Sequence, residues 1–237
     1  SDTAMEYLKL LSFGPGGWGD ELLAGLKITV ALAIATLPFG LIGGLLIAIA
    51  KNTGEKSLVM AANIFTTIFR GLPELLTLFI VYYGGQIALQ KFVNLFTDTY
   101  VEVNGFVAGM IALGLVFAAF ASEVFLSAFR GIPKGQPEAA YALGLSRYQS
   151  FRLVVLPQLI RLALPGLSNL WQVHLKGTSL VSVIALDDLI RKSQIAVGNT
   201  KEPLFFFGVV CLVYITLTFI SQRTLDAVEA RLERGHG

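Results

Sequence analysis

Charged residues are scarce in this chain. Only 14% of its 237 residues are Asp, Glu, Lys or Arg, whereas a soluble globular domain carries about 25%. The deficit falls in long runs, because residues 28–50, 103–122 and 203–222 contain no charged side chain. Each run is long enough to cross a hydrocarbon core of about 30 Å as a helix that rises about 1.5 Å per residue. The composition therefore indicates membrane spans and excludes a soluble core.

The residue types on which catalysis and metal binding usually depend are also few. The single cysteine, Cys211, cannot form an intrachain disulfide, and the two histidines, His174 and His236, are far apart. No spacing of histidine, cysteine and carboxylate residues suggests a metal site, and no nucleophile stands beside a general base. The glycine-rich segment 13–20 lacks the Lys-Ser or Lys-Thr that follows in a phosphate-binding loop. We predict no catalytic residue, metal site or cofactor in this chain.

Five apolar segments are predicted to form the transmembrane helices of an all-α membrane protein. They cover approximately residues 24–50, 58–90, 105–129, 151–175 and 203–222. They leave no room for a second, soluble domain, so residues 1–237 are expected to form a single transmembrane domain. The net charge of +2 indicates no nucleic-acid partner. The partner that the composition does indicate is the lipid bilayer.

Basic residues near the span ends predict the orientation of the chain. Nine lie between spans one and two, between spans three and four, and after span five: Lys51, Lys56, Arg130, Lys134, Arg147, Arg152, Arg223, Arg231 and Arg234. The opposite side has five, or seven when Lys27 and Lys176 at span edges are included. Cytoplasmic loops carry an excess of Lys and Arg. The bias therefore predicts an outside N-terminus and a cytoplasmic C-terminus.

Span two contains a predicted break. As one helix, residues 57–90 would run about 50 Å, well beyond the apolar thickness of a bilayer. The middle of the span reads Arg70, Gly71, Leu72, Pro73 and Glu74. We predict two helical pieces that meet at residues 70–73, with Pro73 opening the second. Freed backbone groups are tolerated at membrane depth only against protein or a water-filled path, so these five residues are candidates for the substrate site.

Two interpretations remain open for the charged residues at the break. The positive end of a helix dipole suits an anionic substrate group such as a carboxylate, and Arg70 would add a bidentate guanidinium to the same anion. Glu74 would then face a substrate cation. Alternatively, Arg70 and Glu74 pair with each other at helical i, i+4 spacing and merely close the break.

Glu123 is a second candidate for the substrate site. It follows a long uncharged run, and its neighbours at residues 118–122 are mostly small. Small residues let helices approach closely or leave room for a ligand, and a carboxylate at membrane depth indicates a function by default. The alternative is a position near the cytoplasmic interface, where Glu123 would pair with Arg130 or Lys134.

A polar segment separates spans four and five. Asp187 and Asp188 are followed by Arg191 and Lys192. Such a mixture of charges is typical of a solvated helix face. We therefore expect both aspartates on an external, solvated helix.

The segment QPEAAYALGLSRYQSFRLVVLP, residues 136–157, is the most informative part of the chain. Gln136 and Pro137 form a helix start signal, with proline suited to a first helical position, and Gly144 is a stop signal. Between these signals lie the smaller residues Glu138, Ala139 and Ala140. They would form a smooth surface that fits closely into a partner's groove. The alternative is an ordinary helical connector between two spans.

This segment resembles the signature loop of membrane subunits of bacterial ATP-binding-cassette importers. The shared pattern is Glu-Ala-Ala, three residues, Gly, nine residues and then Val-x-Leu-Pro. Similarity to the polar amino acid importer permeases extends to three further stretches: FRGLPELL (69–76), SEVFLSAFRGIPKGQPEAA (122–140) and LPGLSNLWQVHLKGTSLVS (164–182). The resemblance covers residues 20–225 approximately. It points to the Q-type subunits of histidine and lysine–arginine–ornithine systems, with opine permeases as near relatives.

The resemblance implies a fold, partners and solutes. The fold would be the five-span fold of type I importers in a bacterial inner (plasma) membrane, with a cytoplasmic coupling helix near residues 136–146. Its coupling residues would be Gln136, Glu138, Ala139, Ala140 and Gly144. Expected partners are a second permease subunit in a heterodimer, a dimer of ATPase subunits that binds ATP and Mg²⁺, and a periplasmic solute-binding protein. Expected solutes are polar amino acids, often cationic, and opines.

One departure from the family pattern concerns Glu123. Many relatives carry an arginine three residues after the matching acid, where this chain has Leu126. An ion pair or substrate role inferred around Glu123 therefore does not transfer directly from the relatives.

An alternative function is a secondary transporter or channel driven by an ion gradient, which would use Glu74 or Glu123 as its proton or sodium site.

Overall fold

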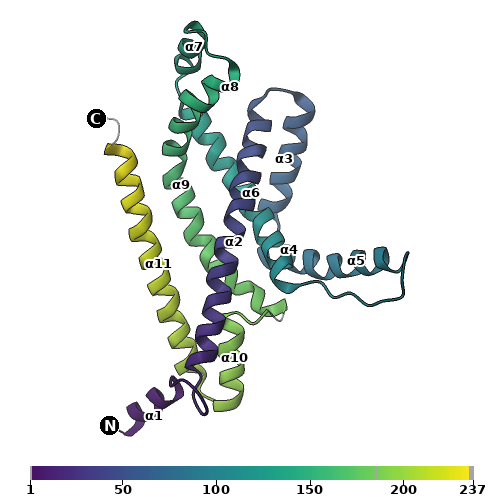
Figure 1. Ribbon diagram of the computed structural model, residues 1–237, viewed down its shortest axis with the longest axis vertical. Coiled ribbons are helices and arrows are strands. Elements are labelled where there is room, and N and C mark those ends of the chain that lie inside the picture. Colours follow the sequence, from purple (N-terminus) through teal and green to yellow (C-terminus); the bar gives the residue numbers. More distant parts are fainter. Residues whose placement is uncertain (1, 185, 235–237) are drawn as a thin grey trace. The chain divides into compact units, whose positions relative to one another are not determined.

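Figure 1 shows the computed structural model of the chain, which describes residues 2–184 and 186–234. His236 lies outside the described residues. Within them every regular element is helical, in agreement with the predicted all-α fold. The elements are α1 (Asp2–Leu10), α2 (Gly19–Asn52), α3 (Lys56–Gly71), α4 (Glu74–Phe79), the π-helix η1 (Ile80–Gly84), α5 (Gly85–Val93), α6 (Gly105–Gly131), α7 (Gly135–Ala142), α8 (Arg147–Ser150), the π-helix η2 (Phe151–Val155), α9 (Leu156–Gly177), the 3₁₀ helix η3 (Thr178–Ile184), α10 (Leu189–Thr200) and α11 (Pro203–Arg234).

Four long helical segments of the described chain are apolar enough to cross a membrane. They are α2, α6, the continuous run Arg147–Ile184, and α11 as far as Leu232. Helix α3 and the run Glu74–Val93 meet the same criterion together, as a helix pair bent at a short break. Counting the pair as one span gives five candidate spans. Each overlaps one of the five segments predicted from the sequence.

The helices belong to two compact units. Unit 1 comprises Ser1–Leu37, Pro73–Gly114 and His174–Phe219, and unit 2 comprises Pro38–Leu72, Leu115–Val173 and Ile220–Gly237. Each of the long helices α2, α6, α9 and α11 therefore contributes one part to each unit. Helix α3 belongs to unit 2, whereas α4 belongs to unit 1.

Unit 1 contains two apolar clusters. The first joins α2, α4, α6 and η3 through the buried side chains of Leu32, Leu78, Ala112, Leu113, Val181 and Ile184. The second joins α2, α10 and α11 through Leu22, Leu189, Ala196, Phe206 and Val210. Lipid tails are as apolar as these side chains, so between membrane helices such clusters stabilise mainly through close packing.

The prediction that both aspartates of the 187–192 segment are solvated is wrong for Asp188. This residue is fully buried at the N-cap of α10, where its Oδ1 accepts a hydrogen bond from the Arg191 N–H at 2.9 Å. A Cβ at Gly25 would lie 2.7 Å from the Asp188 carbonyl oxygen, so α2 passes directly over this turn. Sequence reasoning missed the burial because its cause, Gly25, is distant in the chain.

In unit 2, helices α2 and α6 approach each other closely. A Cβ added at Gly44 would lie 2.7 Å from the Ala121 Cβ and 3.1 Å from the Ser122 backbone nitrogen. Small residues at such an interface allow backbone contact between membrane helices. The contact fixes how α2 lies along α6, and it brings Lys51 in the last turn of α2 to Glu123 of α6.

The predicted break in span two is confirmed. Helix α3 ends at Gly71, and both Leu72 (φ −84°, ψ 141°) and Pro73 (φ −58°, ψ 135°) have extended backbone before α4 begins at Glu74. The cause is local, because a proline ring disfavours the helical conformation of the residue that precedes it. The Pro73 carbonyl then accepts the first backbone hydrogen bonds of α4, so a new helix starts at once.

Candidate functional site

Arg70 and Glu123, which were predicted as separate candidates, lie together in unit 2. A guanidinium nitrogen of Arg70, in the last turn of α3, is 3.6 Å from Glu123 Oε1 of α6. The guanidinium carbon also lies 5.5 Å from the centre of the Phe120 ring. An ion pair and a cation–π contact therefore both hold the guanidinium. Even so, 44% of the Arg70 side chain remains exposed.

Lys51 is a third member of this cluster, and sequence reasoning missed it. Its Nζ lies 2.5 Å from Glu123 Oε1 and donates a hydrogen bond to Thr66 Oγ1 at 2.8 Å. Only 6% of the Lys51 side chain is exposed, against 34% for Glu123. The sequence indicated only a basic residue in the loop after span one. Its position gives no sign of a partner that lies 72 residues later in the chain.

The charged cluster of Lys51, Arg70 and Glu123 has an excess of positive charge. Both cations share Glu123 Oε1, so the alternative partners of Glu123, Arg130 and Lys134, are not the ones it pairs with. A half-exposed guanidinium beside a carboxylate that already has a buried ammonium partner suits a further anion. The cluster therefore suits a substrate carboxylate better than a substrate cation.

Glu74 belongs to unit 1 and has different surroundings. Its Oε2 lies 2.9 Å from the position that a Cβ at Gly177 would occupy, where α9 meets η3. The residue is half-buried, and no ion pair or side-chain hydrogen bond involves it within the described part of the chain. The proposed i, i+4 pair with Arg70 has no helical basis, because the two residues belong to different helices. Glu74 therefore suits a cationic group.

The three residues between Arg70 and Glu74 shape the break. Gly71 and Pro73 are exposed and Leu72 is half-buried. None of them offers a polar side chain, so any contact with a solute would come from their backbone or from apolar surface. The side chains available for polar recognition are therefore those at the two edges of the break.

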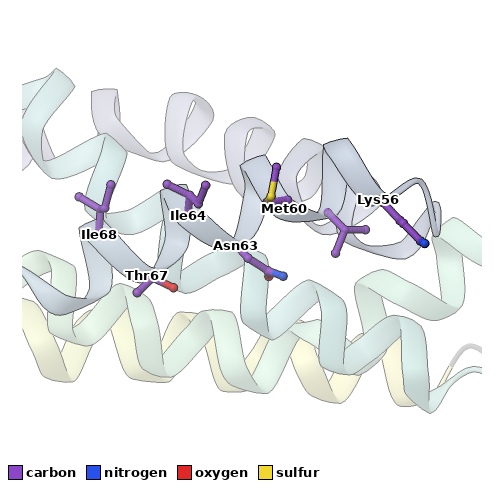
Figure 2. A pocket seen from close by; sticks show the side chains of 7 residues that line it. Lys56, Met60, Asn63, Ile64, Thr67 and Ile68 are labelled. Atoms are coloured by element: carbon purple, nitrogen blue, oxygen red, sulfur yellow. The ribbon is translucent and has the colours of Figure 1, made fainter.

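Helix α3 carries an exposed polar stripe beside an apolar ridge. The polar stripe consists of Lys56, Asn63, Thr67 and Arg70, and the apolar ridge consists of Met60, Ile64 and Ile68; all seven residues are exposed. Residues at these intervals of three, four and seven share a side of a helix. Figure 2 shows Asn63 and Thr67 pointing to one side of α3 and Ile64 and Ile68 to another, along a shallow groove of about 540 Å³.

The polar stripe is unsuited to lipid. Within the described residues the side chains of Asn63 and Thr67 make no hydrogen bond, and such a group in an apolar medium costs about 2–7 kcal/mol. The 14 residue steps from Lys56 to Arg70 span about 21 Å, so a short side chain in the middle cannot reach the headgroup region. By contrast, α11 exposes the apolar series Leu212, Ile215 and Phe219. The polar stripe is therefore expected to face water or protein.

The end of α7 is fixed by Gly144, as predicted. Gly144 has φ +83°, which a glycine adopts without the strain of a side chain. The Leu145 N–H bonds to the Ala140 carbonyl at 3.1 Å, and the Gly144 N–H bonds to the Tyr141 carbonyl at 2.9 Å. This pair of bonds is the Schellman motif, which closes a helix and turns the chain away from it.

The start of α7 differs from the prediction. The helix begins at Gly135, so Pro137 is its third residue and not its first. The proline is still tolerated, because the first four N–H groups of a helix have no partner within it. After α7, Ser146 and Gln149 form a capping box at the start of α8. Hydrogen bonds therefore fix the turn between α7 and α8 on both of its sides.

Most residues of α7 are exposed. Ala140 is buried, at 3% exposure. The exposed side chains, called here the α7 surface, are those of Gln136, Glu138, Ala139, Tyr141 and Ala142, together with Leu143 directly after the helix. Two of these are large: Tyr141 is 49% exposed and Leu143 is 83% exposed. In Figure 1, α7 and α8 lie at one end of unit 2, beyond the adjoining ends of α6 and α9. Exposed aromatic and aliphatic side chains grouped on a short, capped helix are typical of a protein contact surface.

The chain is similar over most of its length to permease subunits of transport systems. The profile of the family described as "binding-protein-dependent transport system inner membrane component" matches residues 40–234. The octopine transport system permease protein OccQ of Rhizobium meliloti is 39% identical over 232 residues, 98% of each chain. The histidine/lysine/arginine/ornithine transport system permease protein HisQ of Salmonella typhimurium is 37% identical over 220 residues, 92% of this chain and 96% of HisQ.

A solved structure has the same fold. It is described as the crystal structure of an amino acid ABC transporter with histidines, and one of its chains matches with a TM-score of 0.77 and 28% identity. The match covers 90% of this chain and 95% of that chain. It agrees with the five-span importer fold expected from the sequence.

Proposed function

Because the chain belongs to the family of binding-protein-dependent transport system inner membrane components, we propose that it is one permease subunit of an ATP-driven importer for polar amino acids or opine-type derivatives. It is a multi-pass protein of the bacterial inner membrane. Its relatives are permeases of octopine and of histidine/lysine/arginine/ornithine systems. The observation that carries the proposal is the exposed α7 surface, on a short helix that the Schellman motif ends at Gly144.

In this proposal a separate ATPase dimer binds ATP and Mg²⁺, and this chain hydrolyses none. The absence of a phosphate-binding loop from the sequence supports this division of labour. Helix α7 docks in a groove of the ATPase through Gln136, Glu138 and Ala139, while Ala140 and Gly144 fix the shape of the helix. The excess of basic residues at the span ends supports a cytoplasmic α7 and an outside N-terminus.

Transport then follows from motion and not from covalent chemistry. ATP binding closes the ATPase dimer, and α7 transmits that closure to the spans as a rigid lever. A second, non-identical permease subunit completes the pore, and a periplasmic binding protein delivers the solute. Each ligand shifts the equilibrium between outward-open and inward-open states by the difference in its affinity for them.

The solute path is proposed to include one charged site in each of the two units. Arg70 binds a carboxylate of the solute. Glu123 belongs to the site because its carboxylate, which also pairs with Lys51, holds the Arg70 guanidinium in place. Glu74 binds a cationic group, and Gly71, Leu72 and Pro73 provide the turn between the two edges of the break in span two. The polar stripe on α3 extends the wetted path through Asn63 and Thr67. Zwitterionic solutes carry a carboxylate that suits Arg70 and a cationic group that suits Glu74.

Reconstitution tests the proposal directly. Proteoliposomes would contain this chain, its partner permease and the ATPase, with the binding protein outside and radiolabelled arginine or octopine as the solute. We expect uptake that requires ATP and stops without the ATPase. An ion-gradient-driven secondary transporter, which the relatives do not support, would take up solute on a proton or sodium gradient alone. Gradient-driven uptake without the ATPase would overturn the proposal.

A further inference from the structure

Unit 2 contains a pocket between α7 and the adjoining ends of α2 and α6. It has a volume of about 500 Å³, and α8 and η2 complete its wall. It is called here the α7 pocket. Its lining includes the basic residues Arg130, Lys134 and Arg147 together with Ser150 and the rings of Phe129 and Phe151. The pocket is therefore basic on one part of its wall and aromatic on another.

The positive charge of the α7 pocket is not neutralised. Arg130, Lys134 and Arg147 are exposed, and none of them forms an ion pair within the described residues. No acidic side chain is among the described residues that line the pocket. Three cations with no counter-ion around one cavity attract an anion, and the two guanidinium groups match the oxygens of a phosphate in particular.

Ser150 adds an independent sign of a missing ligand. The residue is only 1% exposed, yet its Oγ has no hydrogen-bond partner among the described residues. A buried hydroxyl without a partner is destabilising, and such groups in native proteins usually find an acceptor. An anionic oxygen in the α7 pocket would supply that acceptor.

We propose that the α7 pocket binds the phosphodiester headgroup of an anionic phospholipid. The cations and Ser150 would hold the phosphate, and the rings of Phe129 and Phe151 would contact the glycerol and the first acyl carbons. A free phosphate ion would leave this apolar wall without a contact. The basic residues in question are among those that predict the cytoplasmic side, and the cytoplasmic leaflet is rich in anionic lipid.

A lipid in this position would fix the base of α7. Two lining residues, Pro137 and Tyr141, belong to α7, and Asn52 ends α2. The other lining residues belong to the chain segments on either side of α7. The bound headgroup would therefore join α7 to α6 and α8 and make the proposed lever more rigid. The binding site itself does not depend on the proposed transport function, so it is tested without a transport assay.

Binding is measured on the purified permease complex in a neutral detergent. Its thermal unfolding is followed with dioleoylphosphatidylglycerol, dioleoylphosphatidylcholine or inorganic phosphate at equal concentration. We expect phosphatidylglycerol alone to raise the unfolding temperature, by about 2–4 °C at saturation. The shift should shrink at high salt, because the ion contacts are exposed and screened. An equal shift with inorganic phosphate would overturn the assignment to lipid.

Three variants and one matched control locate the site. Arg130→Gln and Arg147→Gln should each reduce the affinity for phosphatidylglycerol about tenfold, if each loses one charge-assisted phosphate contact. Arg152→Gln is the matched control, because Arg152 is exposed in the same segment but does not line the pocket. Ser150→Ala should weaken lipid binding without lowering the stability of the lipid-free complex, because it removes an unsatisfied hydroxyl. Equal affinities in Arg147→Gln and Arg152→Gln would refute the site.

Discussion

Lys51 Nζ lies 2.5 Å from Glu123 Oε1, whereas a guanidinium nitrogen of Arg70 lies 3.6 Å from the same oxygen. The two cations also differ in exposure, at 6% for the Lys51 side chain and 44% for the Arg70 side chain. Water can solvate the Arg70 charge but scarcely reaches the Lys51 charge. The stability of the cluster therefore depends mainly on the Lys51–Glu123 pair.

This relationship predicts unequal effects of removing each partner. Glu123→Gln leaves the buried Lys51 ammonium without a counter-ion, and the loss of one partner of a buried pair costs about 3–5 kcal/mol. Lys51→Met should cost less, because Glu123 is one-third exposed and keeps Arg70. The double variant should be more stable than Glu123→Gln alone. Thermal unfolding of the purified complexes measures all three, and additive losses in the double variant would contradict the pairing.

A second prediction concerns the end of α7. Gly144→Ala places a Cβ on a residue with φ +83°, which costs about 1–2 kcal/mol and loosens the Schellman turn. We expect solute-stimulated ATP hydrolysis and uptake to fall together, while the amount of protein in the membrane stays unchanged.

Gly135→Ala is the control for this prediction. Gly135 begins the same helix, has no positive φ, and a Cβ there would meet nothing within 4 Å. It should therefore leave ATP hydrolysis and uptake as they are. If the two alanine variants behave alike, or if Gly144→Ala retains full coupling, α7 is not the lever.

The features that sequence reasoning predicted correctly are those with local causes. Pro73 acts on its own neighbour Leu72, so the break is readable from two adjacent residues. Gly144 likewise ends α7 through the conformation of a single residue. Pro137 was expected at the first helical position but is the third residue of α7, because proline is compatible with any position in the first turn.

The features that were missed depend on contacts between distant segments. Lys51 is buried where Gly44 lets α2 approach α6 closely, and Asp188 is buried where Gly25 lets α2 pass over the start of α10. The residues next to Lys51 and Asp188 in the sequence do not indicate that either side chain is buried. The chemistry of the candidate site changes as a result, because the Lys51 charge gives the cluster around Glu123 an excess of positive charge that favours an anion.

A third prediction tests the polar stripe of α3. Thr67→Val keeps the shape of the side chain and removes its hydroxyl, and Asn63→Leu removes the amide. If these groups hydrogen-bond the passing solute, each loss of about 1 kcal/mol should raise KM for uptake about fivefold. Ile64→Val on the apolar ridge is the control and should leave KM unchanged. Measured uptake kinetics that are the same in all three variants would place the stripe away from the solute.

Asp188 provides a pH-dependent prediction. Burial raises the pKa of its carboxyl from the ordinary 3.8 to about 6, while hydrogen bonds from backbone N–H groups act in the opposite direction. Its Oδ2 has no hydrogen-bond partner among the described residues, so the charged form is poorly compensated. Asp187 is the nearby acidic residue that raises the pKa further.

The sign follows from the proton bound in each state. Below pH 3.8 the carboxyl is protonated in both the folded and the unfolded protein, and its contribution to stability is fully present. Between pH 3.8 and about 6 the unfolded chain releases this proton while the folded protein keeps it, so stability falls as the pH rises. The contribution is lost once the pH has passed about 6, and the total loss is on the order of 3 kcal/mol. Asp188→Asn keeps an N-cap acceptor for the Arg191 N–H and cannot ionise. Thermal unfolding should therefore show the variant more stable than the native chain at pH 7.5, with the difference shrinking toward pH 4. A difference that is constant across this range would mean that Asp188 is ionised in the folded protein throughout.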